Sequence, residues 1–198
     1  MQYFTVFRFV SAATAASGLL LALMACAPSL NWREVRPPQG QGLVLMFPCK
    51  PEHHERRLTL PGLNGGPVTM HLLSCEADGR TWALSYLDAS TPERWLQAPH
   101  ALSDALCANL SVGRPASGDA RRDLGPAAVP GMTPHPAARI WQMTGQRPVS
   151  ATTFEAAQVQ TWLFTKGLSV FQASVWAPAL REDDPGLKAF ASGFNFPH

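Results

Sequence analysis

The chain of 198 residues has few charged residues and lacks the local patterns by which hydrolases and nucleotide-binding enzymes are recognised. After residue 25 there is no Gly-x-Ser-x-Gly, Ser-x-x-Lys or His-Glu-x-x-His motif and no glycine-rich phosphate loop. Charged residues make up only 15% of the chain, and the net charge is +2. A balance this close to zero argues against the basic field of a nucleic-acid-binding protein. We therefore expect no catalytic residues, no cofactor and no nucleic-acid partner.

The N-terminal stretch holds the most informative pattern. After Arg8 the chain runs without charge to Leu23-Met24-Ala25-Cys26, which resembles a bacterial lipobox. A charge followed by an apolar run and a small residue is typical of an export signal. We expect residues 1–25 to be a lipoprotein signal peptide and Cys26 to be lipidated, because its thiol can take a diacylglyceryl group as a thioether. Two or three long acyl chains then hold the protein permanently at a membrane.

This anchor predicts a location in the cell envelope. By resemblance to enterobacterial lipoproteins, Ala27 after the cysteine favours the periplasmic face of the outer membrane, with the inner membrane as the alternative. An uncleaved anchor helix is the other open interpretation, because no charge lies between Arg8 and Arg33 and about 18 apolar residues can span a bilayer. Ser11 and Thr14 dilute this run, which favours the signal peptide.

The chain after the signal is long enough for one domain with a core of its own. Residues 26–41 are rich in proline and glycine, and this composition predicts a tether between the lipid and the fold. Residues 42–198 are expected to form a single domain.

Three further cysteines follow Cys26, namely Cys49, Cys75 and Cys107. In an oxidising envelope two of them should pair. We expect a disulfide between Cys49 and Cys75, because both end strand-like stretches beside turn residues, while Cys107 is the alternative partner of Cys75. Cys107 lies among apolar residues at helical spacing, which predicts a buried thiol.

The hydrophobic pattern predicts seven or eight strands and two or three helices, with the helices late and separated from one another. Asp78-Gly79 between two apolar runs is typical of a two-residue hairpin. In that register Cys75 faces Trp82, and apolar residues lie on both faces of the pair, so the sheet should be covered on both sides. The fold class is therefore α+β, a mostly antiparallel sheet with helices packed on it. A helix kinked or restarted at Pro99 and a last helix after Asp184-Pro185 are expected.

Three stretches carry a resemblance to a known family, namely 42–52, 75–79 and 187–196. They resemble uncharacterised proteobacterial envelope lipoproteins, and the closing helix followed by an aromatic strand is similar to the PsbP-like fold, an antiparallel sheet between helical layers. The resemblance implies a non-catalytic role in binding or assembly, with another envelope protein or a cell-wall component as partner, and no catalytic residues. The segment 112–136, rich in proline and glycine, is either the partner-binding segment or an irregular connection.

A metal site is one alternative. His53 and His54, with Cys49 and with His71 or Cys75, offer the ligand types of zinc or copper. The spacing matches no standard site, and adjacent histidines in a strand point to opposite faces.

A small periplasmic hydrolase is the other alternative, with an acid pair drawn from Glu76, Asp78 and Asp88. Asp78 is better explained by its turn. The six tryptophans fall mostly within strands and are expected in the core. A pocket between the sheet and a helix is a further open site.

Overall fold

The computed structural model describes residues 30–110, 121–150 and 152–197, which form a single α+β domain. Seven strands make an antiparallel sheet in the order β3-β4-β5-β9-β8-β7-β6, and β1 pairs with β2 beside it. The elements are β1 (Arg33–Val35), β2 (Leu45–Phe47), β3 (Glu52–Leu58), β4 (Val68–Ala77), β5 (Arg80–Asp88), α2 (Pro92–Leu110), β6 (Arg121–Pro126), β7 (Arg139–Pro148), β8 (Phe154–Lys166), β9 (Ser169–Ala177) and α3 (Pro185–Ser192).

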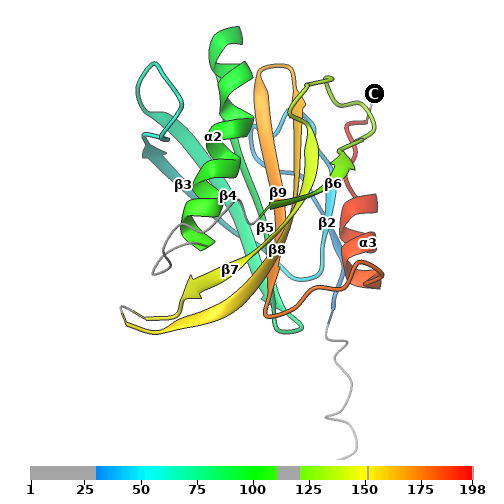
Figure 1. Cartoon of the computed structure of the whole chain (residues 1–198). Coiled ribbons are helices and arrows are strands. Elements are labelled where there is room, and N and C mark those ends of the chain that lie inside the picture. Colours follow the sequence, from blue (N-terminus) through cyan, green and yellow to red (C-terminus); the bar gives the residue numbers. More distant parts are fainter. Residues whose placement is uncertain (1–29, 111–120, 151, 198) are drawn as a thin grey trace, which may run out of the picture.

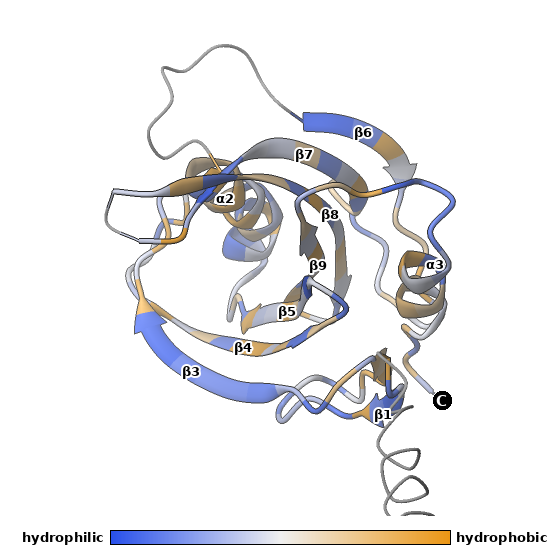
Figure 2. Ribbon diagram, turned by 90° about the horizontal axis from the view of Figure 1, so that it is seen from below, coloured by the Kyte–Doolittle hydropathy of each residue, from blue (hydrophilic) through white to orange (hydrophobic). Residues whose placement is uncertain are grey.

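The sheet separates two layers of different construction. Helix α2 lies against β7, β8 and β9 on one face, while α3 and the β1–β2 pair lie on the other (Figure 1). Seen from below, the sheet curls around α2 (Figure 2). Both faces are thus covered, as the apolar residues on both sides of β4 and β5 predict.

The larger core lies between the sheet and the α3 layer and is mostly aromatic. Trp82, Tyr86, Phe171 and Phe190 are almost fully buried there. The edge of one ring meets the face of another between Trp82 and Phe190, with centroids 5.3 Å apart. Each such side chain contributes roughly 1.5–3 kcal/mol through burial, so this layer is a major source of the domain's stability.

The β4–β5 hairpin forms as the sequence predicts. Asp78 and Gly79 adopt φ of 55° and 66°, which is the left-handed region that a two-residue hairpin turn requires. Cys75 stands opposite Trp82 in the resulting register.

Two sequence expectations are corrected. Helix α2 continues through Pro99, so it does not restart there, and the packing of Ala98, Ala101 and Leu102 against the sheet face supports the continuous helix. Strand β3 ends at Leu58, where the apolar residues Leu58 and Leu60 indicate the start of a strand, because all but one of its residues are exposed and it has no apolar alternation. Charged side chains are common on an edge strand, where they discourage pairing with another chain.

The expected tether 26–41 is also shorter than its composition indicates. Within it, β1 pairs with β2, and Trp32 packs on Trp82 with ring centroids 5.7 Å apart. The hydroxyl of Tyr86 donates to the Pro38 carbonyl at 2.7 Å. Residues 33–38 of this stretch therefore pack on the domain instead of leading loosely to it.

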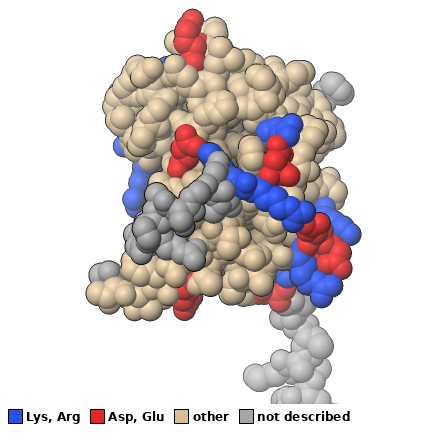
Figure 3. All heavy atoms as spheres, viewed as in Figure 1, with Lys and Arg blue, Asp and Glu red and all other residues tan. Residues whose placement is uncertain are grey.

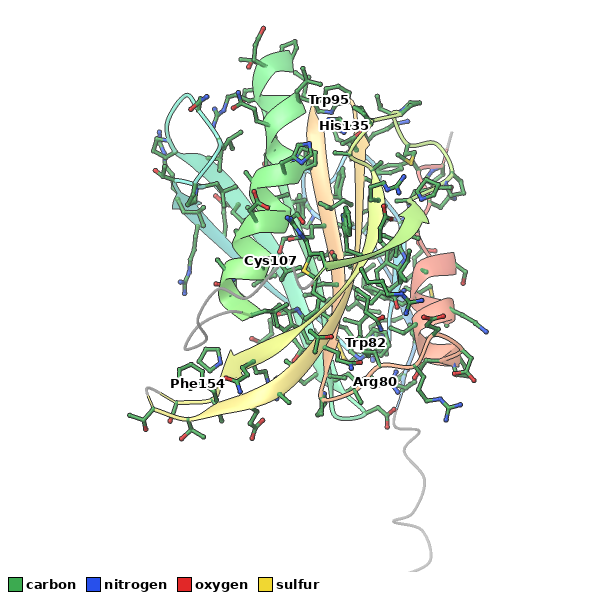
Figure 4. The ribbon with its side chains drawn as sticks, in the orientation of Figure 1. Arg80, Trp82, Trp95, Cys107, His135 and Phe154 are labelled. Carbon is green, nitrogen blue, oxygen red and sulfur yellow. A yellow bond between two sulfur atoms is a disulfide. The ribbon has the colours of Figure 1, made fainter. Side chains whose placement is uncertain are left out.

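Helix α3 is fixed at its start, as expected from Asp184-Pro185. Asp184 accepts the backbone N–H groups of Gly186 at 2.8 Å and Leu187 at 3.2 Å. Arg80, at the start of β5 and beside Trp82 (Figure 4), pairs with the same carboxylate at 2.7 Å. This hydrogen bond holds the pKa of Asp184 below its ordinary value. One carboxylate thus joins the β4–β5 hairpin to α3.

Candidate functional site

The cysteines lie in three different settings. Cys49 and Cys75 stand at disulfide distance, with Cα atoms 6.0 Å apart, and the structure joins them. This is the pair expected from the sequence. Cys107, near the C-terminal end of α2 (Figure 4), has its sulfur 3.6 Å from the sulfur of Met143 and is partly buried. Cys26 and its signal lie outside the described residues.

The histidines considered for the alternative metal site are only partly brought together. His53 Nε2 lies 3.4 Å from His71 Nδ1, and Glu55 approaches the same His71 nitrogen at 3.6 Å. His54 pairs instead with Glu52 at 3.5 Å, as expected for neighbours on a strand. Among the described residues there is no cluster of three or more ligand-type side chains able to hold a metal ion.

Of the three acidic residues considered for hydrolysis, Asp88 lies apart from Glu76 and Asp78. Asp78 occupies the turn before β5 and Asp88 ends that strand. A nine-residue strand spans about 26 Å at 3.3 Å per residue, so Asp88 cannot act together with Asp78 or with Glu76 at the other end.

The segment 112–136 is described only from residue 121 onward, so its first part cannot be placed. Charges on this side of the molecule alternate in sign (Figure 3). Arg139 pairs with Asp123, Arg122 pairs with Glu182, and Arg121 lies 2.7 Å from Asp104. Opposite charges therefore offset one another here, and the described residues of this face form no patch of a single sign.

One buried histidine lies beneath the N-terminal half of α2. The His135 and Trp95 rings are 4.2 Å apart, nearly perpendicular, and both are labelled in Figure 4. His135 Nδ1 accepts the Ala137 backbone N–H at 2.9 Å. Burial lowers the pKa of His135, and the nearby His100 lowers it a little further. The Trp95 backbone has a smaller effect than burial and raises the pKa. The neutral ring thus holds the loop before β7 against α2.

A groove lies between the C-terminal half of α2 and the sheet. The helix contributes Leu102, Ala105, Leu106 and Asn109 to its lining, and strands β4, β5 and β9 supply the opposite wall. Residues of the N-terminal half of α2 pack on Leu63, Val68 and Leu87. Residues near its C-terminal end pack on Met143 and Val159.

The groove has a volume of about 360 Å³, in the lower range for a small-molecule site. Its apolar walls come from both the helix and the sheet: Leu60, Met70, Leu72, Ala83, Leu102, Ala105, Leu106 and Trp176. Its polar lining consists of neutral side chains: Ser74, Thr81, Ser85, Asn109, Gln172 and Ser174.

Gln172 is the unusual member of this lining. Only 6% of the residue is exposed, and its Nε2 has no hydrogen-bond partner within the part of the chain that the structure describes. In the register of the sheet Gln172 stands between Ser85 of β5 and Leu163 of β8. A buried carboxamide with an unpaired donor lowers stability, and such groups occur mainly where function requires them.

The sequence contains a signal for this groove. In Val170-Phe-Gln-Ala-Ser-Val-Trp176, glutamine and serine alternate with apolar residues in an otherwise buried strand. Ser85, opposite Gln172, and Ser74 of β4 belong to the same sheet face. Alternation with small polar residues on the covered face marks the place where the helix layer leaves space.

Within residues 30–110, 121–150 and 152–197, neither helix has the length and hydrophobicity needed to cross a membrane. In comparisons with known proteins, no family model and no curated protein matches the chain.

Proposed function

We propose that this chain is a non-catalytic binding protein of the bacterial cell envelope, held at the membrane through a lipid on Cys26, with the groove beneath α2 as its binding site. The observation that carries the proposal is the groove lining, in which none of the described residues is an acid, a base or a cysteine. Acid–base and nucleophilic catalysis need such groups, whereas a binding site needs only shape and a few polar contacts.

The architecture supports a binding role. A sheet between α2 on one face and α3 with β1–β2 on the other is the arrangement expected of a PsbP-like fold, whose members generally act in binding or assembly. The cysteine pair at disulfide distance is compatible with an oxidising compartment. We place the protein on the periplasmic face of the outer membrane, with another envelope component as its partner.

Co-purification with a groove-blocking variant tests this function. Ala105 lines the groove, and Ala108 is exposed on the same helix. Ala105→Met should fill the groove, whereas Ala108→Met makes the same chemical change outside it. Full-length protein would be isolated from solubilised membranes, and the molecules retained would be identified by mass spectrometry. We expect material that binds to wild type and Ala108→Met but not to Ala105→Met, while an identical set in all three contradicts the proposal.

The anchor has a separate test. Mass spectrometry of the mature N-terminus should show an acylated Cys26, and an intact Met1 contradicts the lipidation.

A further inference from the structure

The groove beneath α2 also indicates what kind of molecule it accepts. We propose that it binds a neutral amphiphile, with an apolar chain along α2 and one carbonyl or amide group paired with Gln172. This inference rests on the proposed function, because it names the ligand class of the same site.

The walls call for an apolar body. Leu102 and Leu106 approach from α2, and Met70 and Leu72 from β4. Leucine and methionine side chains at a groove favour ligands that bury hydrocarbon, and methionine adapts its shape to them. A volume of about 360 Å³ suits one chain or ring system rather than a folded segment of a partner protein.

The lining also selects a ligand without charge. Among the described residues, it contains neither a cation to pair with a carboxylate or phosphate nor an anion to pair with an amine. A charge buried without a partner is strongly disfavoured.

Gln172 supplies the polar contact. Its Nε2 donor has no partner among the described residues, and the three rotatable bonds of the side chain allow the carboxamide to turn towards a ligand. A carbonyl oxygen can accept from this donor, and an amide can also donate to the carboxamide oxygen. Ser85, in register with Gln172, and Ser174 bring hydroxyl groups to the same strip of the lining. The ligand's polar group should therefore lie over β5 and β9.

Calorimetric titration with matched ten-carbon probes tests the inference. Decanamide, decanoate and decylammonium share one chain and differ in the charge of the head group. The protein would begin at residue 27, because this keeps β1 and Leu30, which packs on the larger core. We expect decanamide to bind at pH 7 and the two charged probes to bind at least tenfold more weakly.

Three variants locate the binding. Gln172→Met keeps the length of the side chain and removes the amide, and should weaken decanamide about tenfold, the effect of losing one well-formed hydrogen bond. Ala105→Met should abolish binding, and Ala108→Met should leave it unchanged.

The possible failures are distinct. Equal affinity for decanoate and decanamide overturns the ligand class but leaves the groove as a binding site. Binding of decanamide by Ala105→Met with wild-type affinity overturns its location. If no probe binds while the co-purification still depends on Ala105, the ligand class is wrong and the proposed function stands.

Discussion

Replacing Gln172 by methionine should make this protein more stable, which is the reverse of the usual effect of changing a buried residue. Gln172 is 94% buried on the sheet face beneath α2, and its Nε2 has no partner among the described residues. An unsatisfied buried polar group costs about 1–3 kcal/mol, and an apolar group of the same shape removes that cost. Methionine has a similar length and flexibility, so it should pack in the same space.

We expect Gln172→Met to raise the free energy of unfolding by about 1 kcal/mol. In urea unfolding this is a midpoint increase of about 0.5 M, taking a slope of about 2 kcal/mol per molar. The matched control is Gln158→Met on the neighbouring strand β8. Gln158 Oε1 accepts the Leu180 backbone N–H at 2.8 Å, so this variant should lose about 1 kcal/mol. Far-ultraviolet circular dichroism would follow both transitions.

The two variants should therefore change the free energy of unfolding in opposite directions. If Gln172→Met loses as much stability as Gln158→Met, the amide of Gln172 is already satisfied in the empty protein, and the reasoning that reserves it for a ligand is wrong.

Three further predictions concern the surrounding fold. Gly145→Ala should destabilise the domain by about 1–3 kcal/mol, because the added Cβ would clash with the Leu110 carbonyl oxygen. Urea unfolding measures this loss. Tyr86→Phe should lower the free energy of unfolding by about 1 kcal/mol, because the hydrogen bond to Pro38 is lost. In the wild-type protein burial, with a smaller contribution from Glu55, raises the pKa of Tyr86 to about 12, and an absorbance titration measures this pKa. Burial lowers the pKa of His135, so the unfolded chain takes up the proton first, and stability present above pH 6.5 should be lost as the pH falls below it. His135→Asn should reduce this dependence in unfolding midpoints compared between pH 7.5 and 5.5.

The hydrophobic pattern predicts the central sheet well, because its signals are local. Asp78-Gly79 fixes the β4–β5 turn and therefore the register on both sides of it. The long β8–β9 hairpin follows in the same way from two apolar runs around Gly167, which has φ of 57°. Asp184 with the proline after it marks the start of α3.

The errors arise where contacts distant in sequence decide the structure. Polarity conceals β3, which gains its strand conformation from pairing with β4. Composition also makes the segment around Trp32 read as a tether, although packing on Trp82 brings it into the fold. Neither partner can be identified from the local sequence.

The sequence predicts the candidate site only in part. It allows a pocket between the sheet and a helix, but the location of this pocket depends on which strands α2 covers. Helix α2 packs on β7, β8 and β9, and this choice leaves Ser74 and Ser85 facing a groove rather than a helix. The alternation of Gln172 and Ser174 shows polar residues on a buried face, but the space above them appears only in three dimensions.

The side-chain amide of Gln172 offers the most direct test of a ligand site beneath α2. In a ¹⁵N–¹H correlation spectrum its NH₂ signals would be assigned by their loss in Gln172→Met, and decanamide would then be titrated into the wild-type protein. We predict a progressive shift of the Gln172 signals, with those of Gln158, which does not line the groove, unchanged. Decanamide binding that leaves the Gln172 signals in place would contradict the account.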